Sequence, residues 1–320
     1  MFVTKKQKSI SFLQAFHISA MSWDTCINEF RLYLQLERSL SANTLDAYLT
    51  DVEKLKQFAL TLPSSPEPEK ITYEQLKTFI RWIHELGVHP RSQARILSGI
   101  RAFYKFLLLT DKIDSDPTSL LESPKIGRKL PEVLSIEEID RMIAAIDLSK
   151  PNGQRNKAML ETLYSCGLRV SELIHLKITD LHFDSGFIRV TGKGNKERLV
   201  PISPRAIKEI TLYMPDRHNL INKIRKEDEN ILFLNLQGHR LSRVAVFSMI
   251  KELARAIGLK KNISPHTFRH SFATHLVDGG ADLRAVQEML GHESIQTTEI
   301  YTHLDREYLR DTILRFHPRS

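Results

Sequence analysis

Cysteine is scarce in this chain of 320 residues. Cys26 and Cys166 are its only two cysteines, and they lie far apart in the sequence. Disulfide-stabilised secreted domains need more cysteines than this, and structural zinc sites need them at closer spacing. The sequence therefore predicts no disulfide framework and no cysteine-based metal site, and a reducing cytoplasm is the compartment that fits it.

Long hydrophobic runs are also missing. No stretch reaches the ~18 apolar residues of a membrane span, and the first twenty residues lack the uninterrupted apolar core of a secretion signal. We expect no membrane contact. We interpret residues 1–21 as a leader, either a disordered arm or a consequence of start-site choice, because Met21 directly precedes an amphipathic helix pattern.

Positive charge is what the chain has in excess. Its formal net charge is +8 and its pI is near 9.4, and Lys and Arg outnumber Asp and Glu both before and after residue 131. A basic surface favours a polyanion through counterion release, although it also serves solubility alone. If the partner is DNA, both halves of the chain should touch it.

The N-terminal part, residues 22–110, is predicted to form four helices. Apolar residues recur there at intervals of three and four, and three segments rich in capping or breaking residues interrupt the pattern, around Ser41, at 63–70 and at 87–90. Residues 111–131 lose the periodicity and gather Pro, Ser and charges. We interpret them as an interdomain linker.

The C-terminal part, residues 132–320, is predicted to combine helices with a small antiparallel sheet. Ser135 and Glu138 have the spacing of a capping box at the start of a helix. Gly167 is expected to end the helix that directly precedes Gly167. Residues 186–202 alternate apolar positions around a Gly-rich centre, which indicates a β-hairpin. The fold class is therefore mainly α with a small antiparallel β-sheet, in two domains.

The fourth N-terminal helix carries basic residues outside its apolar face. They are Arg91, Arg95, Arg101 and Lys105. They could line a DNA groove, but a solvated charged face is the commoner explanation of such a pattern.

Two segments of the C-terminal part suit chemistry at a phosphate, although each has an ordinary structural explanation. Arg169 and Glu172 can share a helix face, either as a surface ion pair or as an arginine that a carboxylate orients toward phosphate. Lys193 lies between two glycines of the hairpin, where it is either solvated or placed to protonate a departing oxygen. Lys196 and Arg198 follow it and could touch backbone phosphates.

The segment after Pro265 gathers further candidates. His266 and Arg269 start a helix, where the dipole favours an anion. His266 and His270 have the spacing of two metal ligands, but the HExxH glutamate is absent and Arg269 would place a positive charge beside the metal, so we predict no metal site. Tyr301 is either a buried tyrosine or a nucleophile, which at a phenol pKa of about 10 needs cations and a proton acceptor.

Together these residues resemble the tyrosine recombinase (phage integrase) family, most closely its bacterial Xer branch. The strings GLRVSEL, TGKGNKERLVPI, HTFRHSFATHL, LGH and YTH carry the resemblance, which covers residues 22–320. It implies the catalytic residues Arg169, Lys193, His266, Arg269, His292 and Tyr301, with Glu172 orienting the site. The candidate DNA contacts are Arg91, Arg95, Arg101, Lys105, Lys196, Arg198 and Arg243.

The resemblance also implies a function. Such an enzyme recombines DNA at a specific site through a 3′-phosphotyrosine intermediate without metal, cofactor or ATP, and its two domains clamp the duplex. Four protomers act on two duplexes, and the segment 305–320 docks on a neighbouring protomer, with packing on its own chain as the alternative. The Xer branch resolves chromosome dimers with a paralogous Xer recombinase and an FtsK-type DNA translocase.

Three other functions remain open at this level. The same catalytic residues serve integrases and invertases of mobile elements. A DNA-binding protein that keeps the fold without catalysis is a rival from another class, although the complete residue set disfavours it. A metal-dependent nuclease is the third, and it would lose activity in EDTA.

Overall fold

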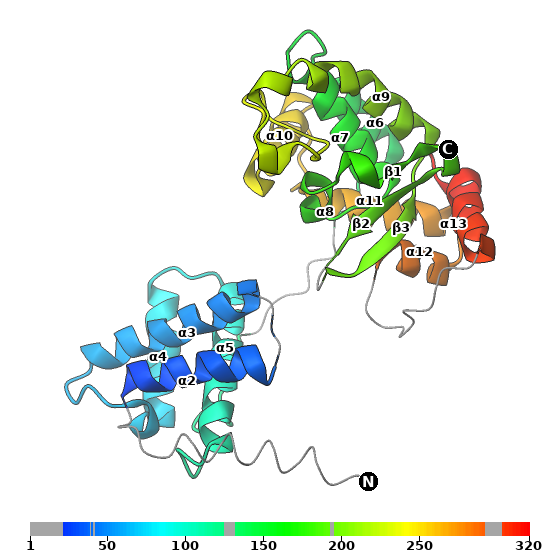
Figure 1. The fold of residues 1–320 in the computed structure, drawn as a ribbon. Helices are drawn as coiled ribbons and strands as arrows, with labels where there is room; N and C mark the ends of the chain where they lie inside the picture. Colours follow the sequence, from blue (N-terminus) through cyan, green and yellow to red (C-terminus); the bar gives the residue numbers. More distant parts are fainter. Residues whose placement is uncertain (1–21, 39, 41, 125–131, 193–194, 292–302) are drawn as a thin grey trace. The chain divides into compact units, whose positions relative to one another are not determined.

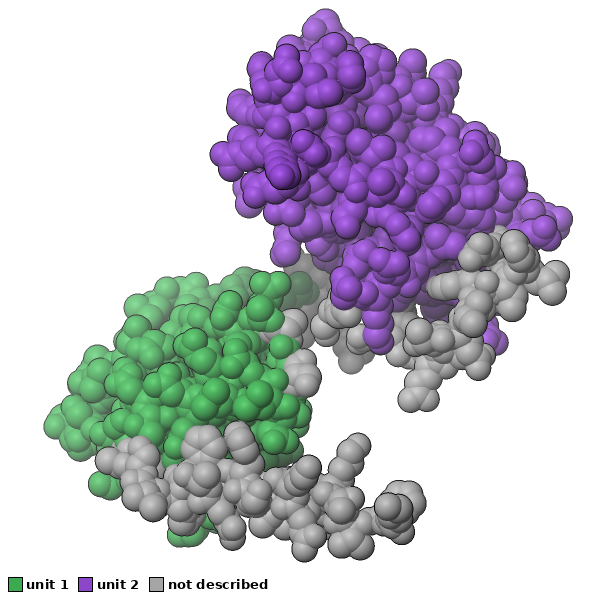
Figure 2. All heavy atoms as spheres, viewed as in Figure 1, with its two compact units in different colours: residues 1–129 green, residues 130–320 purple. Residues whose placement is uncertain are grey.

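The chain forms two compact units, residues 1–129 and 130–320 (Figures 1 and 2). The computed structural model describes residues 22–38, 40, 42–124, 132–192, 195–291 and 303–320. Each unit has a hydrophobic core of its own. None of the helices in these described ranges is long and apolar enough to cross a membrane.

Unit 1 contains the four long helices that the periodicity predicts. They are α2 (Trp23–Leu36), α3 (Ala42–Thr61), α4 (Tyr73–Glu85) and α5 (Pro90–Leu109), with the 3₁₀ turn η2 (Pro68–Lys70) between α3 and α4. The Ser22 hydroxyl caps α2, and Thr72 forms a capping box with Gln75 at the start of α4. The helix boundaries therefore fall at the breaking segments read from the sequence.

Aromatic side chains fill the core of unit 1. Phe30 and Phe103 meet edge to face with ring centroids 5.3 Å apart, and both are fully buried. Leu121 is buried against the same core, and Ile113 packs on it. The predicted linker 111–131 therefore begins too early, because its first part belongs to unit 1, held by apolar contacts that its irregular composition conceals.

Unit 2 is helical around a three-stranded antiparallel sheet of order β1-β2-β3. Its helices are α6 (Ile136–Ala144), α7 (Gly153–Ser165), α8 (Val170–Ile174), α9 (Pro204–His218), α10 (Arg243–Ala256), α11 (Pro265–Asp278), α12 (Leu283–Leu290) and α13 (His303–Phe316). Its strands are β1 (Leu181–His182), β2 (Phe187–Thr191) and β3 (Glu197–Pro201), and 3₁₀ turns lie at η3 (Ile178–Asp180), η4 (Phe183–Ser185), η6 (Ile221–Lys223) and η7 (Lys226–Asp228). The mainly α class with a small antiparallel sheet is confirmed.

The local signals in unit 2 are confirmed as well. The Ser135 hydroxyl accepts a hydrogen bond from Glu138 N (3.2 Å), and the Glu138 carboxylate accepts one from Ser135 N (2.8 Å). Strands β2 and β3 form the expected hairpin, with Val190 opposite Arg198. Gly167 ends α7 in the left-handed region at φ +57°. Short-range sequence patterns thus fix most of the elements.

The helix α13 packs on its own unit. Leu309 and Ile313 are buried in the core of unit 2, and α13 lies against α11, α12 and β3 (Figure 1). Beyond it, the buried Arg319 forms ion pairs with Glu161 of α7 (3.0 Å) and Asp140 of α6 (2.7 Å). In this structure the segment 305–320 therefore takes the alternative of packing on its own chain.

The tail also buries a histidine. His317 is 2% exposed, and its ring lies 4.8 Å from that of Tyr164 and 5.5 Å from that of Phe272, centroid to centroid. Burial lowers the pKa of His317 to about 3, and the neighbouring Arg319 charge acts in the same direction. The imidazole is therefore neutral in the folded protein at any pH near neutrality.

We predict that His317 makes stability fall as pH falls. The unfolded imidazole titrates near pH 6.5 and the folded one near 3, so between these values only the unfolded state gains the proton. The free energy of unfolding should drop by up to ~1.4 kcal/mol per pH unit below 6.5 from this group. His317 Nδ1 accepts a hydrogen bond from Arg319 N (3.1 Å). His317→Asn, which offers an amide oxygen as the acceptor instead, should flatten the slope between pH 6.5 and 5.

Urea unfolding followed by circular dichroism measures this slope. Trp fluorescence is unsuitable because Trp23 and Trp82 both lie in unit 1. Equal slopes for the two proteins would contradict the prediction.

Candidate active site

The turn after α7 places the first arginine of the site. At Gly167 an added Cβ would clash with the ring of Phe272 on α11, so the turn needs both the positive φ and the missing side chain. The chain then reverses, and Arg169 becomes the N-cap of α8. The close approach of α7 and α11 thus sets where the Arg169 side chain starts.

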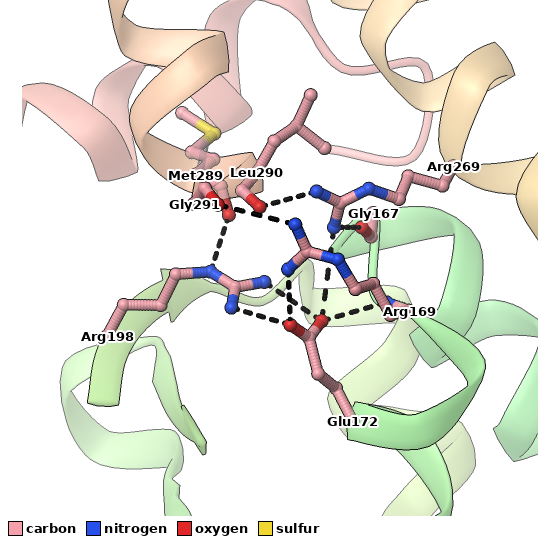
Figure 3. Close-up of polar contacts among 8 residues, drawn as sticks. All are labelled: Gly167, Arg169, Glu172, Arg198, Arg269, Met289, Leu290 and Gly291. Carbon is pink, nitrogen blue, oxygen red and sulfur yellow. Dashed lines mark hydrogen bonds and ion pairs between the residues drawn. The ribbon is translucent and has the colours of Figure 1, made fainter. Parts of the chain in front are cut away.

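Glu172 lies at the centre of the site and binds Arg169 twice (Figure 3). Its carboxylate accepts hydrogen bonds from the Arg169 backbone N (2.8 Å) and from Arg169 Nη1 (2.8 Å). The Glu172 side chain is 2% exposed, whereas the Arg169 side chain is 33% exposed. The carboxylate therefore lies inside the protein, and the guanidinium of Arg169 keeps a face toward solvent.

Arg198 of β3 binds the same carboxylate. Its Nη1 and Nη2 donate to the two Glu172 oxygens at 2.8 and 2.9 Å, a bidentate pair. The side chain is only 7% exposed. The predicted contact of Arg198 with DNA phosphates is therefore wrong for this structure, because its guanidinium is buried and already bound.

Arg269 of α11 completes the cluster. Its Nη1 donates to the carbonyl of Gly167 at 2.7 Å and lies 3.9 Å from the Glu172 carboxylate. Burial lowers the pKa of Arg269 to about 10, the Arg169 charge acts in the same direction, and Glu172 opposes them. The side chain therefore stays cationic at neutral pH.

The carbonyl groups at the end of α12 receive one hydrogen bond from each arginine (Figure 3). Arg198 donates to Met289, Arg269 to Leu290 and Arg169 to Gly291. These carbonyls form the negative end of the helix dipole. A single carboxylate cannot balance three guanidinium groups, and these carbonyls supply part of the missing negative charge.

Glu172 is ionised because of these neighbours. Burial alone would raise the pKa of its carboxyl, but the hydrogen bonds and charge of Arg198, together with the bonds from Arg169, bring the pKa below its usual value. Arg169, Arg198, Arg269 and Glu172 are called the arginine cluster below.

The structure describes four of the seven residues that we predict to form the site. Arg169, Arg269 and Glu172 lie together, and His266 is exposed at the start of α11, one turn before Arg269. Lys193, His292 and Tyr301 lie outside the described residues. Nowhere in the described ranges do three or more His, Cys, Asp or Glu side chains form a group that could hold a metal.

Two of the four basic candidates on α5 are bound within unit 1. Arg95 forms a bidentate pair with the fully buried Asp51 at 2.6 and 2.7 Å, and Arg101 donates to the Leu121 carbonyl and to Ser123. These pairs join α5 to α3 and to the chain after α5, so both side chains have a structural role beside the DNA contact that we predict for them. The exposed candidates are Arg91, Arg95, Lys105, Lys196 and Arg243.

The motifs do not predict the role of Arg198, but the pattern of the strand could have indicated it. In β3 the residues Arg198 and Val200 are buried, whereas Glu197, the first residue of the strand, is exposed. Side chains two residues apart share a sheet face, so Arg198 shares the inner face with Val200. The alternation of the strand could therefore have placed it inside.

Two family models match the chain. The phage integrase family matches residues 132–307, and the phage integrase N-terminal SAM-like domain matches residues 27–110. The two matches fall within unit 2 and unit 1, respectively.

Curated relatives match along nearly the whole chain. The tyrosine recombinase XerD of Staphylococcus saprophyticus subsp. saprophyticus is 43% identical over 297 residues, which cover 93% of this chain and 100% of the relative. The tyrosine recombinase XerD of Staphylococcus aureus strain Mu50 is 42% identical over 298 residues, with the same coverage of both chains.

Solved structures share the fold. The XerH site-specific recombinase bound to a palindromic difH substrate has a TM-score of 0.66 at 21% identity, over 96% of this chain and 88% of that chain. The Tn1549 transposon integrase in complex with circular intermediate DNA has a TM-score of 0.68 at 20% identity, over 90% of this chain and 98% of that chain. At these identities the likeness concerns the fold alone.

We predict that Glu172→Gln destabilises unit 2 by about 3–5 kcal/mol, the usual result of removing one partner of a buried ion pair. The glutamine keeps the size and one acceptor but leaves Arg198 and Arg269 buried without a counter-charge. Urea unfolding by circular dichroism measures the loss. Glu197→Gln is the control, because this exposed carboxylate lies 4.0 Å from Arg189 and should matter by less than ~0.5 kcal/mol. Equal stability of the two variants would show that charge does not hold the cluster together.

Proposed function

The chain belongs to the phage integrase family of tyrosine recombinases, as its motifs predict, and we propose that it cleaves and rejoins duplex DNA through a 3′-phosphotyrosine intermediate on Tyr301. It is a site-specific recombinase similar to XerD. One observation carries the chemical part of the proposal. Arg169 and Arg269, which lie 100 residues apart in the sequence, converge on one ionised carboxylate.

The arginine cluster suits a phosphate that gains charge during reaction. Arg169 is one-third exposed, so donors of its fork are available to a non-bridging phosphate oxygen. Arg269 adds a second positive charge from its buried position. Since Glu172 and the α12 carbonyls hold these groups before DNA binds, little reorganisation is needed when the transition state forms.

The proposed cleavage step exchanges one phosphoester for another. The Tyr301 oxygen attacks phosphorus while the bond from phosphorus to the 5′-oxygen breaks. His266 accepts the phenolic proton, and Lys193 donates a proton to the leaving 5′-oxygen. His292 hydrogen-bonds the phosphate. The phosphotyrosine ester keeps the energy of the broken bond, so a 5′-hydroxyl of a partner strand can reverse the step without ATP.

The substrate is a duplex recombination site. The XerH and Tn1549 integrase structures that share the fold are DNA complexes, and both halves of this chain carry a basic excess. We propose that both units contact the duplex, and that four protomers assemble on two duplexes.

The biological role that we propose is resolution of chromosome dimers at cell division. The similarity to XerD over nearly the whole chain supports it. A paralogous Xer recombinase and an FtsK-type DNA translocase are then the expected partners, and the cytoplasm is the location. Footprinting on genomic fragments, with and without a candidate partner, would identify the site and distinguish this role from that of a mobile element.

We predict a covalent adduct on a suicide duplex that carries this site with a nick near the cleavage point. The short fragment that bears the 5′-hydroxyl leaves after cleavage, so the phosphotyrosine persists and can be seen by denaturing electrophoresis. Tyr301→Phe should form no adduct because it lacks the nucleophilic oxygen, and EDTA should not change the yield. An adduct with Tyr301→Phe, or its loss in EDTA, would overturn the chemistry.

We also predict that DNA binding and cleavage depend on different basic residues. Arg269→Ala should abolish cleavage with little loss of binding. Arg91→Ala and Lys105→Ala should each weaken duplex binding and lower the salt slope by about 1, as loss of a phosphate contact does. Fluorescence anisotropy over a range of salt concentrations measures both quantities.

Two controls complete this experiment. Lys77→Ala removes an exposed lysine of α4 that pairs with Glu74, and binding should not change. Arg95→Ala is a poor probe, because it leaves Asp51 buried without a partner and should destabilise unit 1. Salt slopes that stay unchanged in both Arg91→Ala and Lys105→Ala would exclude α5 from the DNA interface.

A further inference from the structure

We propose that Arg198 is a positioning residue of the recombinase, which holds the hairpin that carries Lys193 against Glu172 and the end of α12. The proposal rests on the proposed function, since Lys193 is taken there as the proton donor. Arg198 itself does not touch DNA. It acts by fixing the segments that border the reacting groups.

The contacts of Arg198 leave it little freedom. Its three guanidinium nitrogens all donate, Nη1 and Nη2 to Glu172 of α8 and Nε to the Met289 carbonyl of α12. The side chain is 7% exposed and stands opposite Val190 in the sheet. A cation that has lost its water in this way needs all of its partners, so β3, α8 and α12 are tied at one point.

On the hairpin, the residue before Lys193 lies close to Arg198 and Glu172. A Cβ added at Gly192 would lie 3.6 Å from Arg198 Nη1 and 3.7 Å from the Glu172 carboxylate. Gly192 N also donates to the Lys196 carbonyl at 2.7 Å, which closes the hairpin. The backbone at Gly192, the residue before Lys193, therefore lies beside the Arg198–Glu172 pair.

The α12 side reaches the residue before His292. Gly291 has φ +63°, and a Cβ built there would lie 3.1 Å from Arg198 Cδ. Its carbonyl accepts a hydrogen bond from Arg169 at 3.3 Å. The end of α12 thus lies on Arg198 from one side and on Arg169 from the other (Figure 3).

Lysine cannot replace Arg198 in this arrangement. An ammonium keeps the charge opposite Glu172, so folding should survive, but it has neither the planar fork nor an Nε–H to reach Met289 at the same time. Arg198→Lys should therefore loosen the hairpin and α12 relative to Glu172 while the charge pair remains.

The test is the rate of cleavage of two suicide duplexes by Arg198→Lys. One has the natural 5′-oxygen at the scissile phosphate, and the other has sulfur in its place. A thiolate, whose acid has a pKa of about 8.5, leaves without the proton that an alkoxide needs. The sulfur duplex therefore needs no proton from Lys193. The rate that it restores to Lys193→Ala shows how large the rescue by sulfur can be.

We expect Arg198→Lys to cleave the oxygen duplex roughly 10- to 100-fold more slowly than the unchanged protein. Losses of this size are usual when a residue that orients a metal ligand is mutated. DNA binding and its salt slope should stay the same, and the sulfur duplex should restore most of the lost rate. Arg189→Lys is the matched control, because Arg189 lies on the neighbouring strand in a more exposed pair with Asp180, and its ratio of the two rates should equal that of the unchanged protein.

Three results would overturn the proposal. One is cleavage of the oxygen duplex by Arg198→Lys at the normal rate. Another is slow cleavage of both duplexes alike, which indicates general damage. A third is weaker binding with a lower salt slope, which makes Arg198 a phosphate contact. If the unchanged protein forms no adduct at all, the proposed function itself fails, so the two failures are distinguishable.

Discussion

The carboxylate of Glu172 is the group on which the arrangement of the arginine cluster in unit 2 depends. Three guanidinium groups from α8, β3 and α11 meet at this point, and like charges at such distances repel strongly where water is largely excluded. Without the carboxylate, their mutual repulsion would destabilise unit 2. Three segments that lie far apart in the chain are therefore joined by electrostatics as well as by their hydrophobic core.

The same cluster divides its arginines into two kinds. Arg198 has a donor from each guanidinium nitrogen satisfied inside the protein, whereas Arg169 keeps one-third of its side chain open to solvent. Residue type alone cannot make this distinction. What separates them is the element that carries each residue, because β3 turns Arg198 toward the core and the N-terminus of α8 leaves Arg169 at its edge.

Sequence patterns predict local features well and pairwise features poorly. Helices, caps and the hairpin follow from signals within a few residues, as at Ser135 and Gly167. The partner of Arg95 is 44 residues away, and that of Arg319 is 158 residues away. Such pairs leave no periodic trace in the sequence. The linker prediction is wrong at Leu121 for the same reason, because one apolar residue in an irregular segment does not indicate which core it joins.

Net charge likewise counts charges without their partners. Of the seven basic residues that the sequence suggests for DNA, Arg95, Arg101 and Arg198 are bound within their own unit. Yet the arginine cluster holds three guanidinium groups against one carboxylate, and the remaining compensation comes from the α12 carbonyls, which carry only partial charge. The cluster therefore keeps a positive excess that the fold stabilises in advance. In the function that we propose, an anionic phosphate at Arg169 would complete this balance, and the energy spent in assembling like charges during folding would become affinity for the charge that develops in the transition state.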